Sequence, residues 1–131
     1  MFPITDVMTK DVVTTTIDTP ILAAAQILVD RRITGLPVVD AENNLVGILS
    51  EFDVLRLLIE PTADHNKVVN DFMSKRVIAF EDTASAIEVC DFFLKNPNKR
   101  RVPITHHGKL VGLVSRGDIV KYIVKIRYHI T

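Results

Sequence analysis

Two copies of a Ser-x-x-Asp pattern, Ser50 to Asp53 and Ser115 to Asp118, carry the side chains in this sequence that are best placed for chemistry. Each copy stands where an apolar β-rich run gives way to a helical run. In that position the serine caps the helix, and the acid three residues later reaches back to the serine backbone. A helix start also favours an anion, because its free N–H groups point out of the helix. The pattern therefore predicts a helix cap, an anion-binding position, or both.

The second copy also carries basic residues that the first copy lacks. Arg101 stands two residues before Pro103, at the position that Gly35 occupies before Pro37. A guanidinium offers paired N–H donors that match a phosphate group. The basic residues of this loop are equally explained as a solvated rim, although Arg101 is set apart by its place next to the motif proline: Lys95, Lys99, Arg100 and Arg101.

The chain repeats itself, so the elements that must position these side chains occur twice. The run 6–9 (DVMT) recurs as 71–74 (DFMS), and 45–50 (LVGILS) recurs as 110–115 (LVGLVS), both 65 residues further along. The duplication predicts two units, residues 1–66 and 67–131. A unit of this size buries only about 60% of the surface that its unfolded chain exposes. We therefore expect the halves to pack as one pseudo-twofold body, with paired clefts where they meet.

Each repeat is predicted to run strand, helix, strand, strand, helix, which places the chain in the α/β (α+β) class. Helix starts are marked by 18–20 (DTP) and by Asp82, Thr83 and Ser85. The predicted strands are 12–14, 36–39 and 45–49, and in the second repeat the opening strand is 77–80. Hairpin turns are expected at 41–44 and 106–109, and closing helices over 50–61 and from 115 to about 128. The predicted apolar helix faces are Ile21, Ala24 and Leu28, and Ile87, Cys90 and Leu94.

Composition excludes several classes of protein. The 131 residues are 47% hydrophobic, and 16 Lys and Arg balance 16 Asp and Glu, so no overall field attracts nucleic acid or an anionic membrane. No apolar run approaches the roughly 18 to 20 residues that span a bilayer. The start lacks the features of a secretory signal, and a single cysteine, Cys90, fits a reducing cytoplasm. We therefore expect a cytoplasmic protein with no membrane partner and no nucleic-acid partner.

The sequence contains no recognisable catalytic motif. It contains neither a Gly-x-x-x-x-Gly-Lys phosphate loop nor a Gly-x-Ser-x-Gly nucleophile elbow. His106 and His107 are adjacent in a turn with no Cys, Asp or Glu at ligand spacing beside them, so no metal site is predicted. The expectation is a protein that is not an enzyme.

The order of these motifs resembles the cystathionine-β-synthase (CBS) domain, and two in tandem resemble a Bateman module. The resemblance rests on the doubled Met-Thr or Met-Ser entries, the run 36–40 (LPVVD) and the Gly-x-x-Ser-x-x-Asp closers, and covers nearly the whole chain. It implies a disc-like pair that binds AMP, ADP, ATP, S-adenosylmethionine or a related ligand without an obligatory cofactor. It also implies dimerisation through helices and regulation of an effector protein. Apolar positions on the closing helices agree with a homodimer: Leu55, Leu58, Ile59, Ile119, Tyr122, Ile123 and Ile126.

The resemblance also implies a role for each candidate residue. Asp118 and Asp53 would take the ribose hydroxyls, Ser115 and Ser50 would support the phosphate, and Arg101 beside Pro103 would hold it. Arg116, beside Ser115, either adds a second phosphate contact or is simply solvated. The adenine would lie against the first strand of the repeat, although apolar strand residues in a small domain belong to the core by default: Val13 and Thr14, or Ile78 and Phe80. Because only the second half carries the arginine, we expect the better site there. The alternative is a dimerisation and interaction scaffold in which both Ser-x-x-Asp patterns are only caps.

Overall fold

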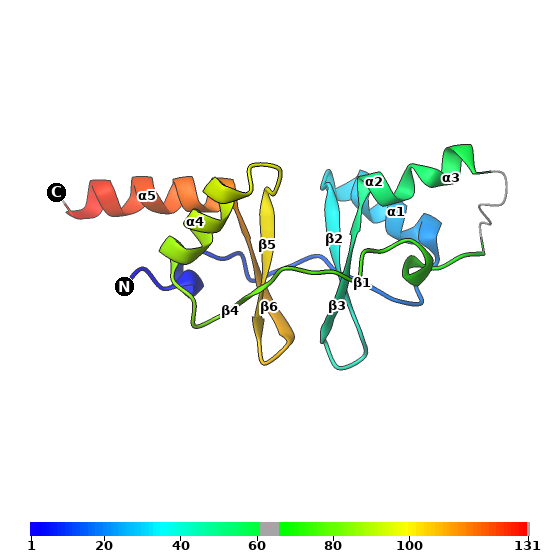
Figure 1. Ribbon diagram of the computed structural model, residues 1–131, viewed down its shortest axis with the longest axis horizontal. Coiled ribbons are helices and arrows are strands. Elements are labelled where there is room, and N and C mark those ends of the chain that lie inside the picture. Colours follow the sequence, from blue (N-terminus) through cyan, green and yellow to red (C-terminus); the bar gives the residue numbers. More distant parts are fainter. Residues whose placement is uncertain (61–65, 131) are drawn as a thin grey trace. The chain divides into compact units, whose positions relative to one another are not determined.

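A computed structural model describes residues 1–60 and 66–130, with side chains up to Arg127. Figure 1 shows its helices and strands. The chain forms two compact units. One unit joins Met1–Val12 to Ile78–Thr131 and is here called the outer unit, because its residues flank the other unit in the sequence. The other unit, Val13–Val77, is here called the central unit. These units do not coincide with the sequence repeats, because the opening segment of each repeat packs with the body of the other.

The central unit is built around a three-stranded sheet. The strand β1 (Thr15–Thr16) pairs in parallel with β2 (Gly35–Val39), which pairs antiparallel with β3 (Leu45–Ser50). Its helices are α1 (Ile21–Arg31), α2 (Glu51–Val54) and α3 (Arg56–Ile59), with a 3-10 turn η2 (Val69–Asp71). The predicted closing helix is thus two short helices, and the last predicted residue, Pro61, lies outside the described residues.

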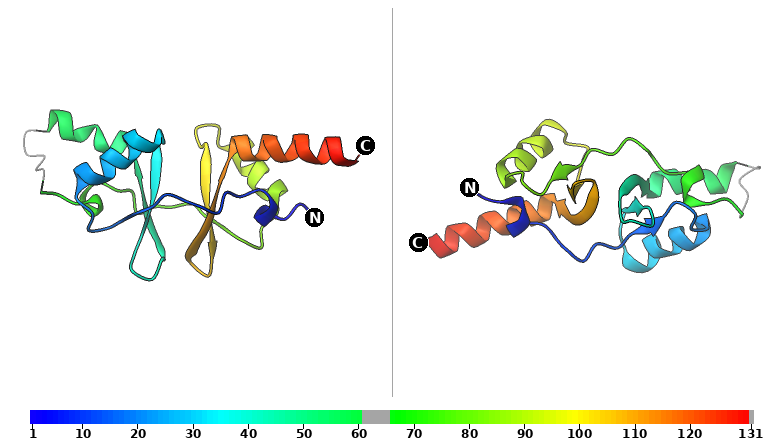
Figure 2. Two further views of the ribbon diagram at one scale, coloured as in Figure 1. Left: turned by 180° about the vertical axis from the view of Figure 1, so that it is seen from behind. Right: turned by 90° about the horizontal axis from the view of Figure 1, so that it is seen from below.

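The outer unit repeats this plan. The strand β4 (Phe80–Glu81) pairs in parallel with β5 (Arg101–His106), which pairs antiparallel with β6 (Lys109–Ser115). Its helices are α4 (Ala86–Lys95) and α5 (Arg116–Ile130), and its N-terminal 3-10 turn is η1 (Ile4–Asp6). The blue N-terminal segment runs beside α5 in both views of Figure 2, and the Phe2 and Tyr122 rings meet edge to face with centroids 6.1 Å apart.

The opening strands of both repeats lie further along the chain than predicted. The predicted ranges were 12–14 and 77–80, whereas β1 is Thr15–Thr16 and β4 is Phe80–Glu81. The parallel register fixes this shift, because Thr15 stands opposite Val38 and Phe80 opposite Ile104. Apolar residues before each strand therefore precede the sheet instead of forming it.

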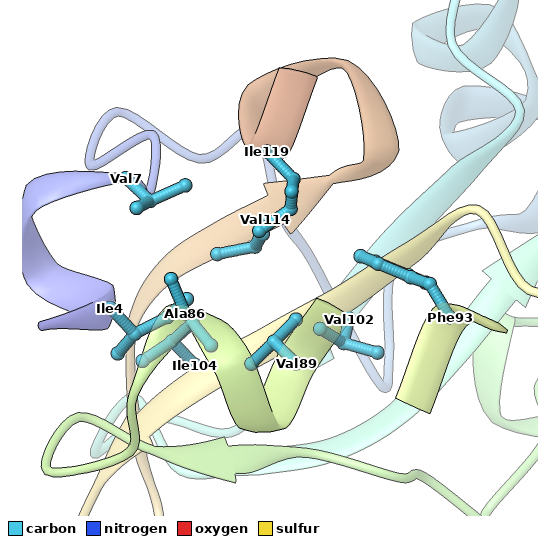
Figure 3. Close-up of a cluster of buried hydrophobic side chains, with 9 residues drawn as sticks. All are labelled: Ile4, Val7, Ala86, Val89, Phe93, Val102, Ile104, Val114 and Ile119. Carbon is cyan, nitrogen blue, oxygen red and sulfur yellow. The ribbon is translucent and has the colours of Figure 1, made fainter. Parts of the chain in front are cut away.

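The two long helices of the repeats test the predicted apolar faces differently. Ile21, Ala24 and Leu28 are buried in α1, as predicted. In α4 the prediction was wrong: Ile87 and Leu94 are 59% and 77% exposed, and Cys90 is only half-buried. The Ser85 hydroxyl caps α4 by accepting the Glu88 N–H at 3.2 Å. From that start the face turned to the sheet is Ala86, Val89 and Phe93, which Figure 3 shows among the core side chains.

The exchange of opening segments explains the recurring methionines. Met8 lies against Gly112 in β6, where a Cβ atom would stand 2.5 Å from the Met8 sulfur. Met73 lies against Gly47 in β3 in the same way, at 2.6 Å. The Thr9 backbone N–H also donates to the Leu113 carbonyl at 2.9 Å. Each Asp-x-Met-Thr/Ser segment thus docks on the last strand of the unit in which it packs.

Among residues 1–60 and 66–130, no helix combines the length and the apolar character that crossing a membrane requires.

Candidate functional site

Both Ser-x-x-Asp patterns form complete capping boxes at helix starts. The Asp118 N–H donates to Ser115 Oγ at 3.0 Å, and the Ser115 N–H donates to Asp118 Oδ2 at 2.8 Å. In the central unit, the corresponding bonds between Asp53 and Ser50 are 3.3 and 2.8 Å. Oδ1 of each aspartate has no hydrogen bond to any described residue. The cap therefore engages one carboxylate oxygen and leaves the other available.

The two serines differ in what their hydroxyl groups donate to. Ser50 Oγ donates to Asp53 Oδ2 at 3.0 Å. Ser115 Oγ makes no such bond with the described residues and only accepts from the Asp118 N–H. The helices differ as well, since α2 has 4 residues and α5 has 15. The start of α5 thus combines a hydroxyl proton that is not yet donated with a longer helix, whose dipole favours an anion more.

The strand register places Arg101 directly at this helix start. Arg101 is the partner of Ser115 across β5 and β6, as Gly35 is the partner of Ser50 across β2 and β3. The register thus confirms the alignment of Arg101 with Gly35, and the Arg101 side chain is exposed. Pro103 is buried in β5, one residue before the stretch that β4 pairs with.

Arg116 is hydrogen-bonded to backbone carbonyls of the preceding loop and is not simply solvated. Its Nε donates to the Lys99 carbonyl at 2.9 Å, its Nη2 donates to the Pro97 carbonyl, and its backbone N–H donates to the Arg100 carbonyl at 3.0 Å. These bonds hold the loop that leads into Arg101. Among the other basic residues, Lys95 pairs with Asp91 at 2.9 Å on the surface of α4.

The predicted adenine walls are only partly exposed. Ile78 is 51% exposed, whereas Phe80 is half-buried with its ring 5.5 Å from that of Phe92. Val13 and Thr14 are half-buried, and Val13 packs against the central core. Ile78 is therefore the candidate wall with the most accessible apolar surface, while Phe80 and Val13 also serve the cores.

The neighbouring residue Thr15 was missed by the sequence analysis. Its side chain is 5% exposed, and its hydroxyl has no hydrogen-bond partner within the described part of the chain. It stands at the position of Phe80 in the other repeat, opposite Val38. A threonine where the other repeat has phenylalanine was the available signal.

His106 has acidic neighbours that sequence spacing did not reveal. The parallel pairing of β4 with β5 brings Glu81 and Asp82 beside it, so that one ligand atom from each of the three residues lies within 4.8 Å of the others. The His107 backbone N–H donates to Glu81 Oε1 at 2.6 Å, and this bond is the main cause of a lowered pKa of Glu81. Partial desolvation of the carboxylate raises the pKa by less, and the hydrogen bond from the Thr105 hydroxyl lowers it further. Beside His106 the sequence has no acid at ligand spacing, and it is the pairing of β4 with β5 that brings Glu81 and Asp82 there.

Two such α/β units, each with a capped helix start facing its last two strands, define a tandem small-domain repeat. The sequence model of the CBS domain matches residues 4–60 and 69–125. The chain therefore belongs to the CBS domain family, as a tandem pair, and the predicted fold class and resemblance are confirmed.

Curated relatives are longer than this chain. It is 28% identical over 121 residues to the uncharacterized protein MJ1225 of Methanocaldococcus jannaschii, covering 92% of this chain and 42% of that protein. It is 34% identical over 112 residues to the 5′-AMP-activated protein kinase subunit gamma-3 of Homo sapiens, covering 80% of this chain and 23% of that subunit. The chain thus spans less than half of each of these two proteins.

Solved structures match nearly the whole chain. CBSX2 of Arabidopsis thaliana in complex with AMP is 30% identical, with a TM-score of 0.85, over 97% of this chain and 99% of that one. The CBS domain pair of MJ0100 in complex with 5′-methylthioadenosine and S-adenosyl-L-methionine is 27% identical, with a TM-score of 0.75, over 95% and 98%. Both of these CBS pairs bind adenosine compounds.

Proposed function

We propose that this CBS pair is a regulatory module that binds an adenosine ligand, namely AMP, ADP, ATP or S-adenosylmethionine, and that its stronger site lies in the outer unit. The observation that carries the proposal is the pairing of Arg101 with Ser115 at the start of α5. It sets a guanidinium, an undonated hydroxyl proton and a helix N-terminus at one end of a hairpin. The AMP complex of CBSX2 supports the choice of ligand.

Each side chain of the proposed site has a distinct task. Oδ1 of Asp118 accepts a hydrogen bond from a ribose hydroxyl, while Oδ2 stays on the Ser115 N–H. Ser115 Oγ and Arg101 donate to phosphate, and charge-assisted bonds of this kind are the stronger ones. Arg116 acts as a positioning residue through the Pro97 and Lys99 carbonyls, so its own phosphate contact would use a remaining donor.

The apolar part of the outer site is proposed to receive the base. Ile78, with its accessible side chain, forms the adenine wall together with Phe80, which is half-buried. Pro103 has no N–H to donate and thereby leaves the edge of β5 unpaired before β4 begins.

The site of the central unit is proposed to be weaker. Gly35 supplies no cation opposite Ser50, whose hydroxyl is engaged by Asp53. Val13 and Thr14 remain as candidate walls there. A phosphate at this position would have to displace the internal Ser50 to Asp53 bond, which costs affinity.

The module is proposed to act on a partner protein, without turnover of its own, and to form a homodimer. Several apolar side chains on the closing helices are exposed, as a helix-mediated dimer requires: Leu55, Leu58, Ile59 and Ile123. Ile119 does not belong to this set, because it is 7% exposed and lies in the outer core. Sedimentation velocity on the full chain tests the dimer.

A second candidate, a scaffold that binds no nucleotide, is favoured by one observation. Both capping boxes are complete, so each aspartate already has a structural role. In a scaffold, both Oδ1 atoms would face only solvent.

Isothermal titration of the full chain with AMP, ADP, ATP and S-adenosylmethionine separates the two functions. Binding in the micromolar range, about −8.2 kcal/mol at 1 μM, is expected for at least one ligand. Arg101→Ala should weaken binding of a phosphorylated ligand, and Arg100→Ala, which changes the neighbouring exposed arginine, is the matched control. If none of the four ligands gives heat of binding, the nucleotide-binding function is excluded and the scaffold function is favoured.

A further inference from the structure

A second cluster of potential ligands in the outer unit has no part in the proposed nucleotide site. Glu81 stands opposite Thr105 in the parallel pairing of β4 with β5, so the next residues on the two strands, Asp82 and His106, emerge side by side. One ligand atom from each of Glu81, Asp82 and His106 lies within 4.8 Å of the other two. Two carboxylates and an imidazole therefore converge at the end of the sheet that carries the β5–β6 turn.

The spacing within the cluster suits a metal ion. His106 Nδ1 lies 3.1 Å from Asp82 Oδ2 and 3.3 Å from Oδ1. Two ligand atoms at about 2.0 to 2.1 Å from a tetrahedral zinc ion are about 3.3 Å apart. A hydrogen bond between the imidazole and the carboxylate also has this length. The third ligand, Glu81, is what distinguishes a metal site from a simple pair.

Glu81 is held in a fixed orientation beside that pair. Its Oε2 accepts from the Thr105 hydroxyl at 3.0 Å, and its Oε1 accepts from the His107 N–H at 2.6 Å. Each carboxylate oxygen keeps a further lone pair. Outer contacts of this kind orient carboxylates that bind metals.

The turn that carries His106 is equally well fixed, and an ion can reach the cluster. His107 and Gly108 have φ of 50° and 83°, which gives the tight two-residue turn between the paired residues His106 and Lys109. The side chains of His106 and Asp82 are 55% and 25% exposed. The ligands are therefore preorganised at an accessible edge of the sheet.

We propose that Glu81, Asp82 and His106 form a binding site for a divalent transition-metal ion, with Zn²⁺ as the best match to one imidazole and two carboxylates and with water in the remaining position. On binding, any proton shared between Nδ1 and Asp82 is released to solvent, since the ligand nitrogen must be free. Mg²⁺ and Ca²⁺, which prefer six or more oxygen ligands, bind this set more weakly. The proposal does not depend on nucleotide binding.

Isothermal titration of the full chain with zinc chloride, and separately with magnesium chloride, tests the site. We expect one Zn²⁺ per chain, and at least a tenfold loss of affinity in His106→Ala and Asp82→Asn, because even outer-shell changes cost about 10- to 100-fold. The matched control is His107→Asn, which changes the adjacent exposed imidazole but tolerates the left-handed backbone. Thermal unfolding of each variant checks its fold.

Imidazole NMR signals of the wild type give a second measurement that needs no substitution at the site. Substoichiometric Zn²⁺ should shift the His106 ring signals before those of the other three histidines. The proposal is overturned by the absence of saturable binding, by unchanged affinity in the His106 and Asp82 variants, by an equal loss in His107→Asn, or by first shifts on another histidine.

Discussion

Replacing Asp118 by alanine is the perturbation that best separates a ligand site from a helix cap. The change removes Oδ1, proposed to take the ribose, together with Oδ2, which accepts the Ser115 N–H. Losing a hydrogen bond to a charged group costs about 1.5 to 3 kcal/mol. Because each 1.4 kcal/mol is a factor of ten, Kd should rise about 10- to 150-fold for the ligand that binds the wild type.

Asp53→Ala is the matched control, since it removes an equivalent capping box in the central unit. Loss of a cap costs about 0.5 to 2 kcal/mol of stability, so both variants should have a lower free energy of unfolding by a similar amount. Affinity for the stronger site, measured by isothermal titration, should fall only in Asp118→Ala. Equal Kd changes in the two variants would refute the asymmetry, and unchanged affinity in Asp118→Ala would refute the ribose contact.

Three further substitutions test the packing. Gly112→Ala should lower the free energy of unfolding, measured in urea, by about 1 to 3 kcal/mol, because the new methyl group meets the Met8 sulfur. Gly117→Ala is the control and should not destabilise the protein, because its methyl group meets only the Ser115 hydroxyl at 3.6 Å. Equal stability of the two variants would contradict the packing of Met8 against Gly112. Thr15→Val should raise the same free energy by about 1 kcal/mol, since a buried hydroxyl without a partner is removed, and a loss would show that the hydroxyl is satisfied. The pKa of Glu81 is lowered in the folded state from 4.5, so the stability that its carboxylate contributes is present above about pH 4.5 and is lost as the pH falls through the folded pKa. Glu81→Gln should therefore make the thermal unfolding midpoint depend less on pH between about pH 6 and pH 3. An unchanged pH dependence would contradict this.

Much of the fold was predictable because the repeat doubles each signal. The hairpins, the α1 face and the capped helix starts all follow from local periodicity and from the Ser-x-x-Asp patterns. The α4 face was mispredicted because the helix is apolar on more than one side. Helical spacing alone therefore assigns Ile87 and Leu94 to the buried face as readily as Val89 and Phe93. Only the cap at Ser85 and the neighbouring sheet decide between them.

The features that sequence could not supply all depend on contacts between distant residues. The docking of Met8 on Gly112 joins segments more than a hundred residues apart, so the repeat boundaries at 66 and 67 could not reveal which opening segment packs with which body. The loop contacts of Arg116 and the position of Asp82 beside His106 follow from strand pairing. Alignment of Arg101 with Gly35 succeeded because the motif prolines anchor it.

Amide NMR of the labelled full chain during an AMP titration tests the central claim most directly. The account predicts that the backbone signals of Arg101, Ser115 and Gly117 shift first and saturate, ahead of those of Gly35 and Ser50. Shifts confined to the central unit would contradict the placement of the stronger site. If saturating AMP, ADP, ATP and S-adenosylmethionine leave all of these amides unmoved, adenosine-ligand binding itself is contradicted.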